Sequence, residues 1–318
     1  MRPPYPSLSS PFTIAAALAL GHTRDELRQA VRVGRLVSLR RGVLVAAEAR
    51  RVAEQHDTTL HAQDIAALAL AMPRRSLVAV GASATRIHGL PLRRSPPDEL
   101  AVCVNDRRRT CGTHRDGYYL RVARLPEHHV ETRHGVLVTT PARTVLDVAA
   151  HHGFDNGVVA TDAAYHARLI TPSLLRLTAE DLENRPGIET ARECLAFADP
   201  AAESVLESIS RLAMREIGIP MPETQVVLYD DGCIEIRVDF FWRRLRLVGE
   251  ADGLKKYTLN GRQPLDALRD ERERERILRD QDFDIVRWDW RIANNPRLLA
   301  ARLKPALARA EARIGRTG

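Results

Sequence analysis

Hydrophobic positions recur with a helical period at the start of the chain and then form two short strand-like runs. An apolar run covers residues 13–20, and Thr23 stands three residues before Glu26, which is the spacing of a capping box at the start of a helix. We expect that second helix over residues 24–33. The segment RLVSLRRGVLVA then places apolar runs on both sides of an Arg-Arg-Gly turn, which predicts a β-hairpin. The first fifty residues therefore predict a helix, a turn, a helix and a hairpin.

The pattern between residues 53 and 195 alternates between helical and strand-like segments. LHAQDIAALALAM and PARTVLDVAAHHG have helical character, and Pro141 lies near the first turn of the second. DELAVCVN, YYLRVARL and HGVLVTT have the composition of strands. We expect a mixed α/β domain here. Its sequence contains no nucleophile–base pair, phosphate-binding loop or metal-ligand spacing.

A third pattern follows a polar link that contains Pro186 and Pro200. ESVLESISRLAMREIGIP predicts a helix, and CIEIRVDFFW alternates strictly, which predicts a strand with Glu235, Arg237 and Asp239 on its polar face. LRLVGEAD predicts its partner strand, and DIVRWDW predicts another strand after a charged helix. The expected result is a central mixed sheet flanked by helices.

The turn between the two paired strands determines which acidic side chains meet. A two-residue turn at Arg243-Arg244 would place Trp242 opposite Leu245 and would leave Glu250 diagonal to Asp239, about 7–8 Å away. Asp252 would project to the same face as Glu250. We therefore expect Asp239, Glu250 and Asp252 to form one polar patch.

Three carboxylates in one place repel one another unless a cation lies between them. Oxygen ligands suit Mg²⁺ (or Mn²⁺), and such an ion can bind a phosphate and activate a water. The chain contains only three lysines, and two of them, Lys255 and Lys256, follow this patch. Either could stabilise developing charge during phosphodiester hydrolysis. The alternative is a salt-bridged face of the sheet with no catalytic role.

Length and composition restrict the function classes. A chain of 318 residues suggests two or three domains, and a net charge of +7 with a pI near 9.6 is compatible with DNA as a partner. Four cysteines without a CxxC pair favour a reducing compartment and disfavour structural zinc. No segment has the about 20 apolar residues of a membrane helix. We expect a cytoplasmic protein without a membrane partner.

Arginine dominates the first predicted module. The helix–turn–helix–hairpin order is that of a winged helix-turn-helix, in which the second helix enters the major groove and the wing contacts phosphate. The DNA-binding candidates are Arg24, Arg28, Arg32, Arg35, Arg40 and Arg41. The alternative is a small helical subdomain with a solvated arginine face.

The segments TRDELRQAVRVGRLVSLRRGVLV, GASATRIHGLPL, VTTPARTVLDVAA and GVVATDAAYHARLIT resemble the antitoxins of type IV abortive-infection (AbiE-type) toxin–antitoxin systems. The resemblance covers residues 13 to about 180. It implies a winged-helix module followed by an α/β antitoxin domain, repression of the protein's own operon, and a cognate toxin as partner.

The segment from about residue 200 to residue 300 resembles the very-short-patch-repair-like branch of the PD-(D/E)xK endonucleases. ESVLESISRLAMREIGIPMPETQ, IRVDFFWRRLRLVGEADG and DFDIVRWDW carry the likeness. It implies that Asp239 and Glu250 are the two motif acids and that Glu207 is a helix-borne acid, with all three as metal ligands. The lysine expected two residues after Glu250 is replaced by Asp252, so the catalytic lysine is not assigned between Lys255 and Lys256.

The sequence thus predicts a multi-domain α/β protein with a winged helix-turn-helix at residues 1–52, an antitoxin-like α/β domain and helical link at 53–195, and an endonuclease-like domain at 196–318. The expected function is DNA binding with a Mg²⁺-dependent endonuclease, in phage defence or DNA repair. The alternative is a non-catalytic transcriptional regulator or antitoxin. The sequence does not define the DNA target or the oligomeric state.

Overall fold

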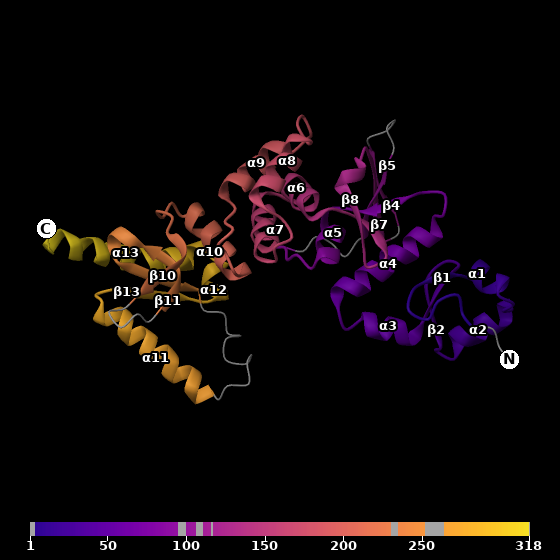
Figure 1. The fold of residues 1–318 in the computed structure, drawn as a ribbon, viewed down its shortest axis with the longest axis horizontal. Coiled ribbons are helices and arrows are strands. Elements are labelled where there is room, and N and C mark those ends of the chain that lie inside the picture. Colours follow the sequence, from indigo (N-terminus) through magenta and orange to yellow (C-terminus); the bar gives the residue numbers. More distant parts are fainter. Residues whose placement is uncertain are drawn as a thin grey trace. The chain divides into compact units, whose positions relative to one another are not determined.

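The computed structural model describes residues 4–94, 100–105, 111–115, 117–229, 235–251 and 264–317. The chain divides into two compact units, Met1–Phe197 and Ala198–Gly318. Both are built from helices and mixed or antiparallel sheets, so the protein is a multi-domain α/β protein (Figure 1). None of the described helices is long and apolar enough to cross a membrane.

The first elements of unit 1 surround a three-stranded sheet of order β1-β3-β2. These elements are β1 (Phe12–Thr13), α1 (Ile14–Ala19), α2 (Arg24–Arg32), β2 (Leu36–Arg40) and β3 (Val43–Ala46). Thr23 and Glu26 form the expected capping box, because each side chain accepts a hydrogen bond from the backbone N–H of the other residue. Leu27 and Ala30 of α2 are buried against Phe12 and Leu36. The expected order of helix, helix and hairpin is present.

Unit 1 continues through two helices into a six-stranded mixed sheet of order β6-β7-β5-β4-β9-β8. The elements are α3 (Ala47–Ala53), α4 (Asp57–Ala71), β4 (Leu77–Ala79), α5 (Gly81–His88), β5 (Leu100–Asn105), β6 (Cys111–Arg115), β7 (Tyr118–Ala123), η1 (Glu127–His129), β8 (Val130–Arg133) and β9 (Val136–Thr139). Ile65 and Leu68 of α4 pack with Val102, Leu120 and Val138 of the sheet. These side chains form the core between α4 and the sheet.

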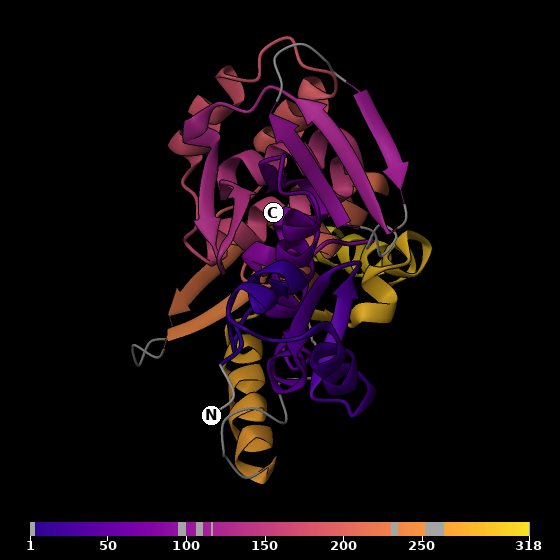
Figure 2. The same cartoon turned by 90° about the vertical axis from the view of Figure 1, so that its right-hand side faces the viewer.

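Four helices complete unit 1: α6 (Pro141–His152), α7 (Phe154–His166), α8 (Pro172–Glu180) and α9 (Ile188–Phe197). Figure 2 looks at the six-stranded sheet with these helices behind it. Gly157 lets α7 approach its neighbours, since an added Cβ there would lie 2.6 Å from that of Ala149 and 2.7 Å from Sγ of Cys194. α7 therefore packs closely against α6 and α9.

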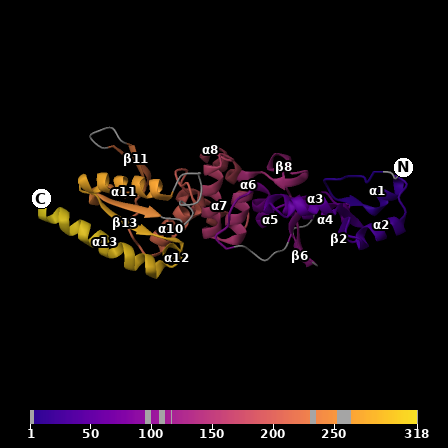
Figure 3. The ribbon, with the colours of Figure 1, turned by 90° about the horizontal axis from the view of Figure 1, so that it is seen from below.

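Unit 2 contains a four-stranded sheet of order β10-β11-β12-β13, in which only the last pair is parallel. Its elements are α10 (Val205–Glu216), β10 (Glu223–Tyr229), β11 (Glu235–Trp242), η2 (Arg243–Leu245), β12 (Leu247–Ala251), α11 (Pro264–Asp280), β13 (Asp284–Trp288), α12 (Trp290–Ala293) and α13 (Pro296–Thr317). Figure 3 shows α11 on one side of the sheet and α12 and α13 on the other.

The β11–β12 connection differs from the predicted two-residue turn. A 3₁₀ turn covers Arg243–Leu245, and Arg246 follows with a positive φ of 48°. Trp242 consequently pairs with Leu247 rather than Leu245, and Phe240 pairs with Gly249. Continuing this register by one residue places Asp239 opposite Glu250, not diagonal to it. The prediction of the register was wrong because a longer turn shifts the partner strand by two residues.

The core of unit 2 depends on close packing of two indoles against β12. A Cβ on Gly249 would lie 2.7 Å from the ring of Trp288 and 3.0 Å from that of Trp242. Trp288 is buried, stacks on Phe240 and donates its N–H to Oγ of Ser210 at 2.7 Å. Trp290, which we expected in the same strand, begins α12 and is 42% exposed.

Candidate functional sites

Glu207 lies in the first turn of α10 and is almost completely buried. Its carboxylate accepts hydrogen bonds from Oγ of Ser204 at 2.7 Å and from the backbone N–H of Glu203 at 3.1 Å, while Ser204 caps the helix in return. Burial raises the pKa of Glu207 above its ordinary value, and these hydrogen bonds act in the opposite direction. The side chain thus has a structural role in addition to any chemical one.

Gln225 links Glu207 to Asp239. Its Nε2 lies 2.9 Å from Oε2 of Glu207 and 3.4 Å from Oδ1 of Asp239. Gln225 sits within β10 at a positive φ of 54°, a conformation that non-glycine residues rarely adopt. The Oδ2 of Asp239 also accepts the backbone N–H of Ala251 at 2.8 Å. Two acids that are far apart in sequence are therefore held by one amide.

Glu250 on β12 is 3% exposed, and its carboxylate pairs with an arginine. Nη2 of Arg274, from α11, lies 2.8 Å from its Oε1 and also donates to the backbone carbonyl of Arg237. Arg237 in turn pairs with Glu203 at 2.9 Å. Since a buried carboxylate needs a compensating charge, Arg274 supplies at least part of it.

The expected metal ligands are near one another but do not form a compact cage in the described part of the chain. Glu207, Asp239 and Glu250 offer hard oxygen ligands of the kind that Mg²⁺ prefers. However, their oxygens do not all come within 4.8 Å of one another. Each also accepts hydrogen bonds from protein donors. Asp252, Lys255 and Lys256 lie outside the described residues.

The arginines expected to bind DNA occur on α2 and the β2–β3 hairpin. Arg24, Arg28, Arg32, Arg35 and Arg41 are exposed. Arg28 pairs with Asp25 at 2.9 Å, with both side chains open to solvent. Arg40 differs, because it is half-buried and its guanidinium lies 5.8 Å from the ring centre of Tyr118 on the central sheet. Arg40 is thus engaged within unit 1.

A buried polar network joins two of the sequence motifs in the central domain. His88 ends α5, and its Nε2 lies 2.7 Å from the backbone carbonyl of Thr139. Oγ1 of Thr144 donates to the same carbonyl at 3.0 Å. Burial lowers the pKa of His88 to about 4, although the hydrogen bond to Thr139 opposes this shift. The ring is therefore neutral near pH 7 and acts as a hydrogen-bond donor.

Arg143 of α6 is the largest fully buried side chain of the chain's described part, at 1% exposure. It forms an ion pair with Asp147 at 3.0 Å and lies 3.0 Å from Nδ1 of His129. Because a guanidinium can only donate, Nδ1 of His129 accepts, and the proton of the neutral ring is on Nε2. This proton faces Oδ2 of Asp181 at 3.2 Å.

That arrangement opposes metal binding at the one described group whose ligand atoms all lie within 4.8 Å of one another: His128, His129 and Asp181. A cation on Nε2 of His129 would move the proton to Nδ1, where it would meet the donors of Arg143. Metal-bound histidines instead need an acceptor behind the ring. The group is better described as a hydrogen-bonded cluster than as a metal centre.

Comparison with known families finds one family model that matches the central part of the chain. Residues 77–197 match the family model described as the AbiEi antitoxin C-terminal domain. The match includes the His88–Thr139 network and the Arg143–Asp147 pair. This match supports the antitoxin-like part of the sequence resemblance over residues 77–197.

Individual relatives are known from Mycobacterium tuberculosis. The uncharacterized proteins MT2308 (strain CDC 1551) and Rv2248 (strain H37Rv) are each 35% identical to this chain over 136 residues, which is 43% of this chain. The matched stretch spans about half of their length, 49%. The crystal structure of the RV2827C protein aligns over 69% of this chain and 83% of that one, with 15% identity and a TM-score of 0.37.

Four residues of these sites were not predicted from the sequence. Gln225 and Arg274 contact carboxylates 14 to 24 positions away, and no local pattern indicates such contacts. Arg143 and Asp147 carry a local signal, because opposite charges four residues apart on an apolar helix can pair. That signal was available in the sequence.

Proposed function

We propose that this protein is a DNA-binding regulator of the antitoxin type. The observation that carries the proposal is the match of residues 77–197 to the AbiEi antitoxin C-terminal domain. In this proposal the N-terminal elements act as a winged helix-turn-helix, and the protein represses the operon that encodes it. The central domain binds a cognate toxin.

The geometry of α2 supports the DNA-binding part. Arg24, Arg28 and Arg32 follow one another at intervals of four residues on a capped helix, so they lie along one exposed face. The exposed Arg41 lies at the tip of the following hairpin. A helix in the major groove with a hairpin on the flanking phosphates would use both groups. Phosphate neutralisation by arginine makes such binding dependent on salt.

The test measures binding of the full chain to the DNA upstream of its own gene by fluorescence anisotropy over a salt series. We expect Arg28→Gln to weaken binding several-fold and to lower the salt slope by about one. Arg192→Gln is the matched control, since Arg192 also forms an exposed ion pair with an acid three residues earlier, at 2.8 Å. Equal affinity and slope for Arg28→Gln and wild type would reject α2 as the DNA-binding helix.

A second candidate function concerns unit 2 alone. Glu207, Asp239 and Glu250 supply buried or half-buried carboxylates, and Asp239 and Glu250 come from neighbouring strands. This arrangement supports an endonuclease-like fold that holds Mg²⁺ or Mn²⁺ on these acids. A bound ion would supply activation of a water and stabilisation of phosphate charge. Glu207, with its raised pKa, would keep its position through Ser204 and Gln225.

Incubation of supercoiled plasmid with the full chain and Mg²⁺ or Mn²⁺ tests this candidate. We expect nicking by wild type and none by Asp239→Asn. Asp284→Asn is the control, because Asp284 lies on β13 and pairs with Arg313 at 3.1 Å, away from the three acids. Intact plasmid with wild type under all metal conditions would reject the endonuclease and leave unit 2 as a binding module.

A further inference from the structure

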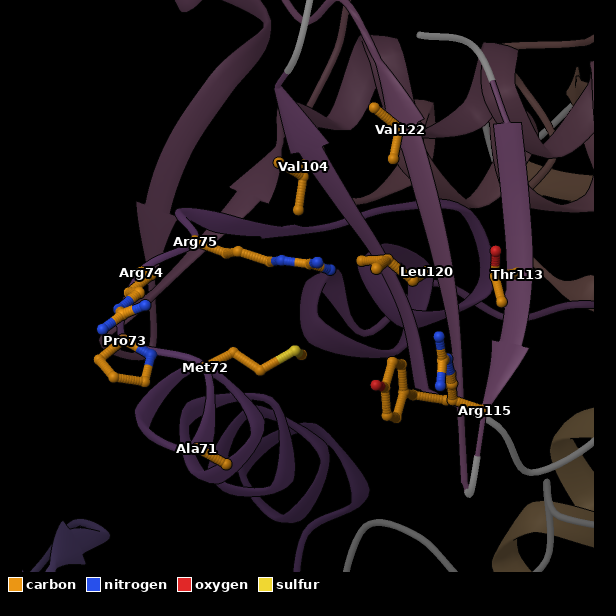
Figure 4. A pocket seen from close by; sticks show the side chains of 11 residues that line it. Ala71, Met72, Pro73, Arg74, Arg75, Val104, Thr113, Arg115, Leu120 and Val122 are labelled. Atoms are coloured by element: carbon orange, nitrogen blue, oxygen red, sulfur yellow. The ribbon is translucent and has the colours of Figure 1, made fainter.

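A hollow of about 700 Å³ lies in unit 1 between the end of α4 and one face of the central sheet (Figure 4). Its floor is aliphatic. Leu120 and Val122 lie two residues apart on β7 and so share a face, and Val104 of β5 pairs with Val122. Met72, at the end of α4, points toward this floor. The hollow therefore offers an apolar surface within the antitoxin-like domain.

Arginines surround the apolar floor. Arg75 extends across the hollow from the turn after α4, and Arg115 stands on β6 at the other wall (Figure 4). Arg115 pairs with Tyr118 of β7, which also lines the hollow. Arg74 lies at the outer rim. None of these three has an ion-pair partner among the described residues, and none of the eleven lining residues is acidic. The hollow thus carries three formal positive charges that no described acid neutralises.

We infer that this hollow binds a free nucleoside phosphate. A single carboxylate would neutralise one of the three guanidinium groups, whereas a di- or triphosphate carries enough charge for all three. Guanidinium groups bind phosphate oxygens in a bidentate manner. The aliphatic floor accepts the flat base, which a simple inorganic anion lacks.

Size favours a mononucleotide over a polymer. Sites for small molecules have volumes of about 300–1,000 Å³, and this hollow lies within that range. Its lining comes from the turn after α4 and from the strands β5, β6 and β7, and its volume suits a single nucleotide. None of the lining residues belongs to α2 or to the three acids of unit 2, so the inference goes beyond the proposed function.

Isothermal titration calorimetry on the full chain, in EDTA and low salt, tests the inference with ATP, GTP, CTP and UTP as probes. We expect at least one triphosphate to bind. The nucleoside that corresponds to it should not bind, and pyrophosphate should bind at least tenfold more weakly than that triphosphate. Arg75→Gln and Arg115→Gln should each weaken the triphosphate at least tenfold. Arg124→Gln is the control, because Arg124 is exposed in the same domain but does not line the hollow.

Two results would overturn the inference. The first is a lack of binding by all four triphosphates, or unchanged binding in both Arg75→Gln and Arg115→Gln. The second is tighter binding of a ten-residue oligothymidylate than of any triphosphate, lost in the same two variants, which would assign the hollow to a nucleic-acid strand. Thermal melting of each variant by circular dichroism verifies that the fold is retained.

Discussion

Nη2 of Arg274 lies 2.8 Å from Oε1 of Glu250, so a guanidinium contacts a carboxylate at which the sequence predicts a metal ion. The glutamate is almost fully buried, and the arginine is 28% exposed in its side chain. A divalent cation would therefore compete with Arg274 for this oxygen. Because of this contact, experiments can distinguish two interpretations of unit 2, a binding module and a metal-dependent enzyme.

Arg274→Ala should reveal this competition. We expect the variant to lose about 2 kcal/mol of stability, less than the about 3–5 kcal/mol of a fully buried pair, because Arg274 is partly exposed. Mn²⁺ should then raise the unfolding midpoint of the variant more than that of wild type. All three tryptophans, Trp242, Trp288 and Trp290, belong to unit 2, so their fluorescence in urea reports this unit.

Arg276→Ala is the control for that measurement, because Arg276 lies on the same helix and, among the described residues, pairs with the exposed acids Glu273 and Asp280. It should change stability by less than about 1 kcal/mol. If Mn²⁺ shifts neither Arg274→Ala nor wild type, the carboxylates of unit 2 do not hold the ion.

Gln225→Leu should destabilise unit 2 by about 2 kcal/mol. The substitution removes the donor that Glu207 and Asp239 share, and hydrogen bonds to charged groups contribute about 1.5–3 kcal/mol. The same fluorescence-detected urea unfolding measures the loss. Gln281→Leu serves for comparison, since Gln281 donates to the carbonyl of Tyr229 at 3.2 Å in an exposed position and should have little effect. Equal stabilities for the two variants would show that the bridge contributes nothing.

His88 should make unit 1 sensitive to acid. Its pKa is about 4 in the folded chain against an ordinary value of 6.5, so between these pH values the unfolded chain binds a proton that the folded chain does not. The contribution of the neutral His88 ring to the free energy of unfolding is therefore complete above pH 6.5 and decreases as the pH falls toward 4. The free energy of unfolding changes by about 3 kcal/mol in total through this group.

Comparison with His88→Gln isolates this effect from other titrations. The difference in unfolding free energy between wild type and this variant, measured by circular dichroism, should change by about 3 kcal/mol in favour of the variant from pH 7 to pH 4. His166→Gln, at the exposed end of α7, should show no such change. A constant difference for His88→Gln would contradict the prediction.

Arg143→Met should be among the most damaging substitutions in the central domain. It leaves the buried carboxylate of Asp147 without its pair, at a cost of about 3–5 kcal/mol. Adding Asp147→Leu removes the uncompensated charge, so the double variant should recover much of this loss in thermal unfolding. A double variant as unstable as Arg143→Met alone would mean that the ion pair does not explain the burial of Arg143.

Local patterns predicted much of the fold. The capping box of Thr23 and Glu26 gave the start of α2, and the alternation of CIEIRVDFFW gave the buried positions of β11. These features depend on neighbours within four residues, where helix and strand geometry repeat. The same reasoning placed Asp239 and Glu250 on adjacent strands but not in the correct register.

The remaining features depend on distant contacts. The 3₁₀ turn and the positive φ of Arg246 set the register of β12, and the sequence RRLR does not specify them. The Gln225 bridge and the Arg274 contact arise only when β10 and α11 pack against the strands that bear the acids. Since many arginines and amides are available to each carboxylate, tertiary packing selects the partner.

Gly249 and Glu250 are adjacent on β12, so they project to opposite faces of the sheet. Gly249 has no side chain, which leaves room for the indoles of Trp242 and Trp288. The next residue, Glu250, carries the buried carboxylate that pairs with Arg274. A shift of this strand by a single residue would drive a carboxylate into the aromatic layer and withdraw it from Arg274 at once. Removal of the Glu250 carboxylate would leave the aromatic packing in place, so the fold constrains the register of β12 more strictly than it constrains the acid itself.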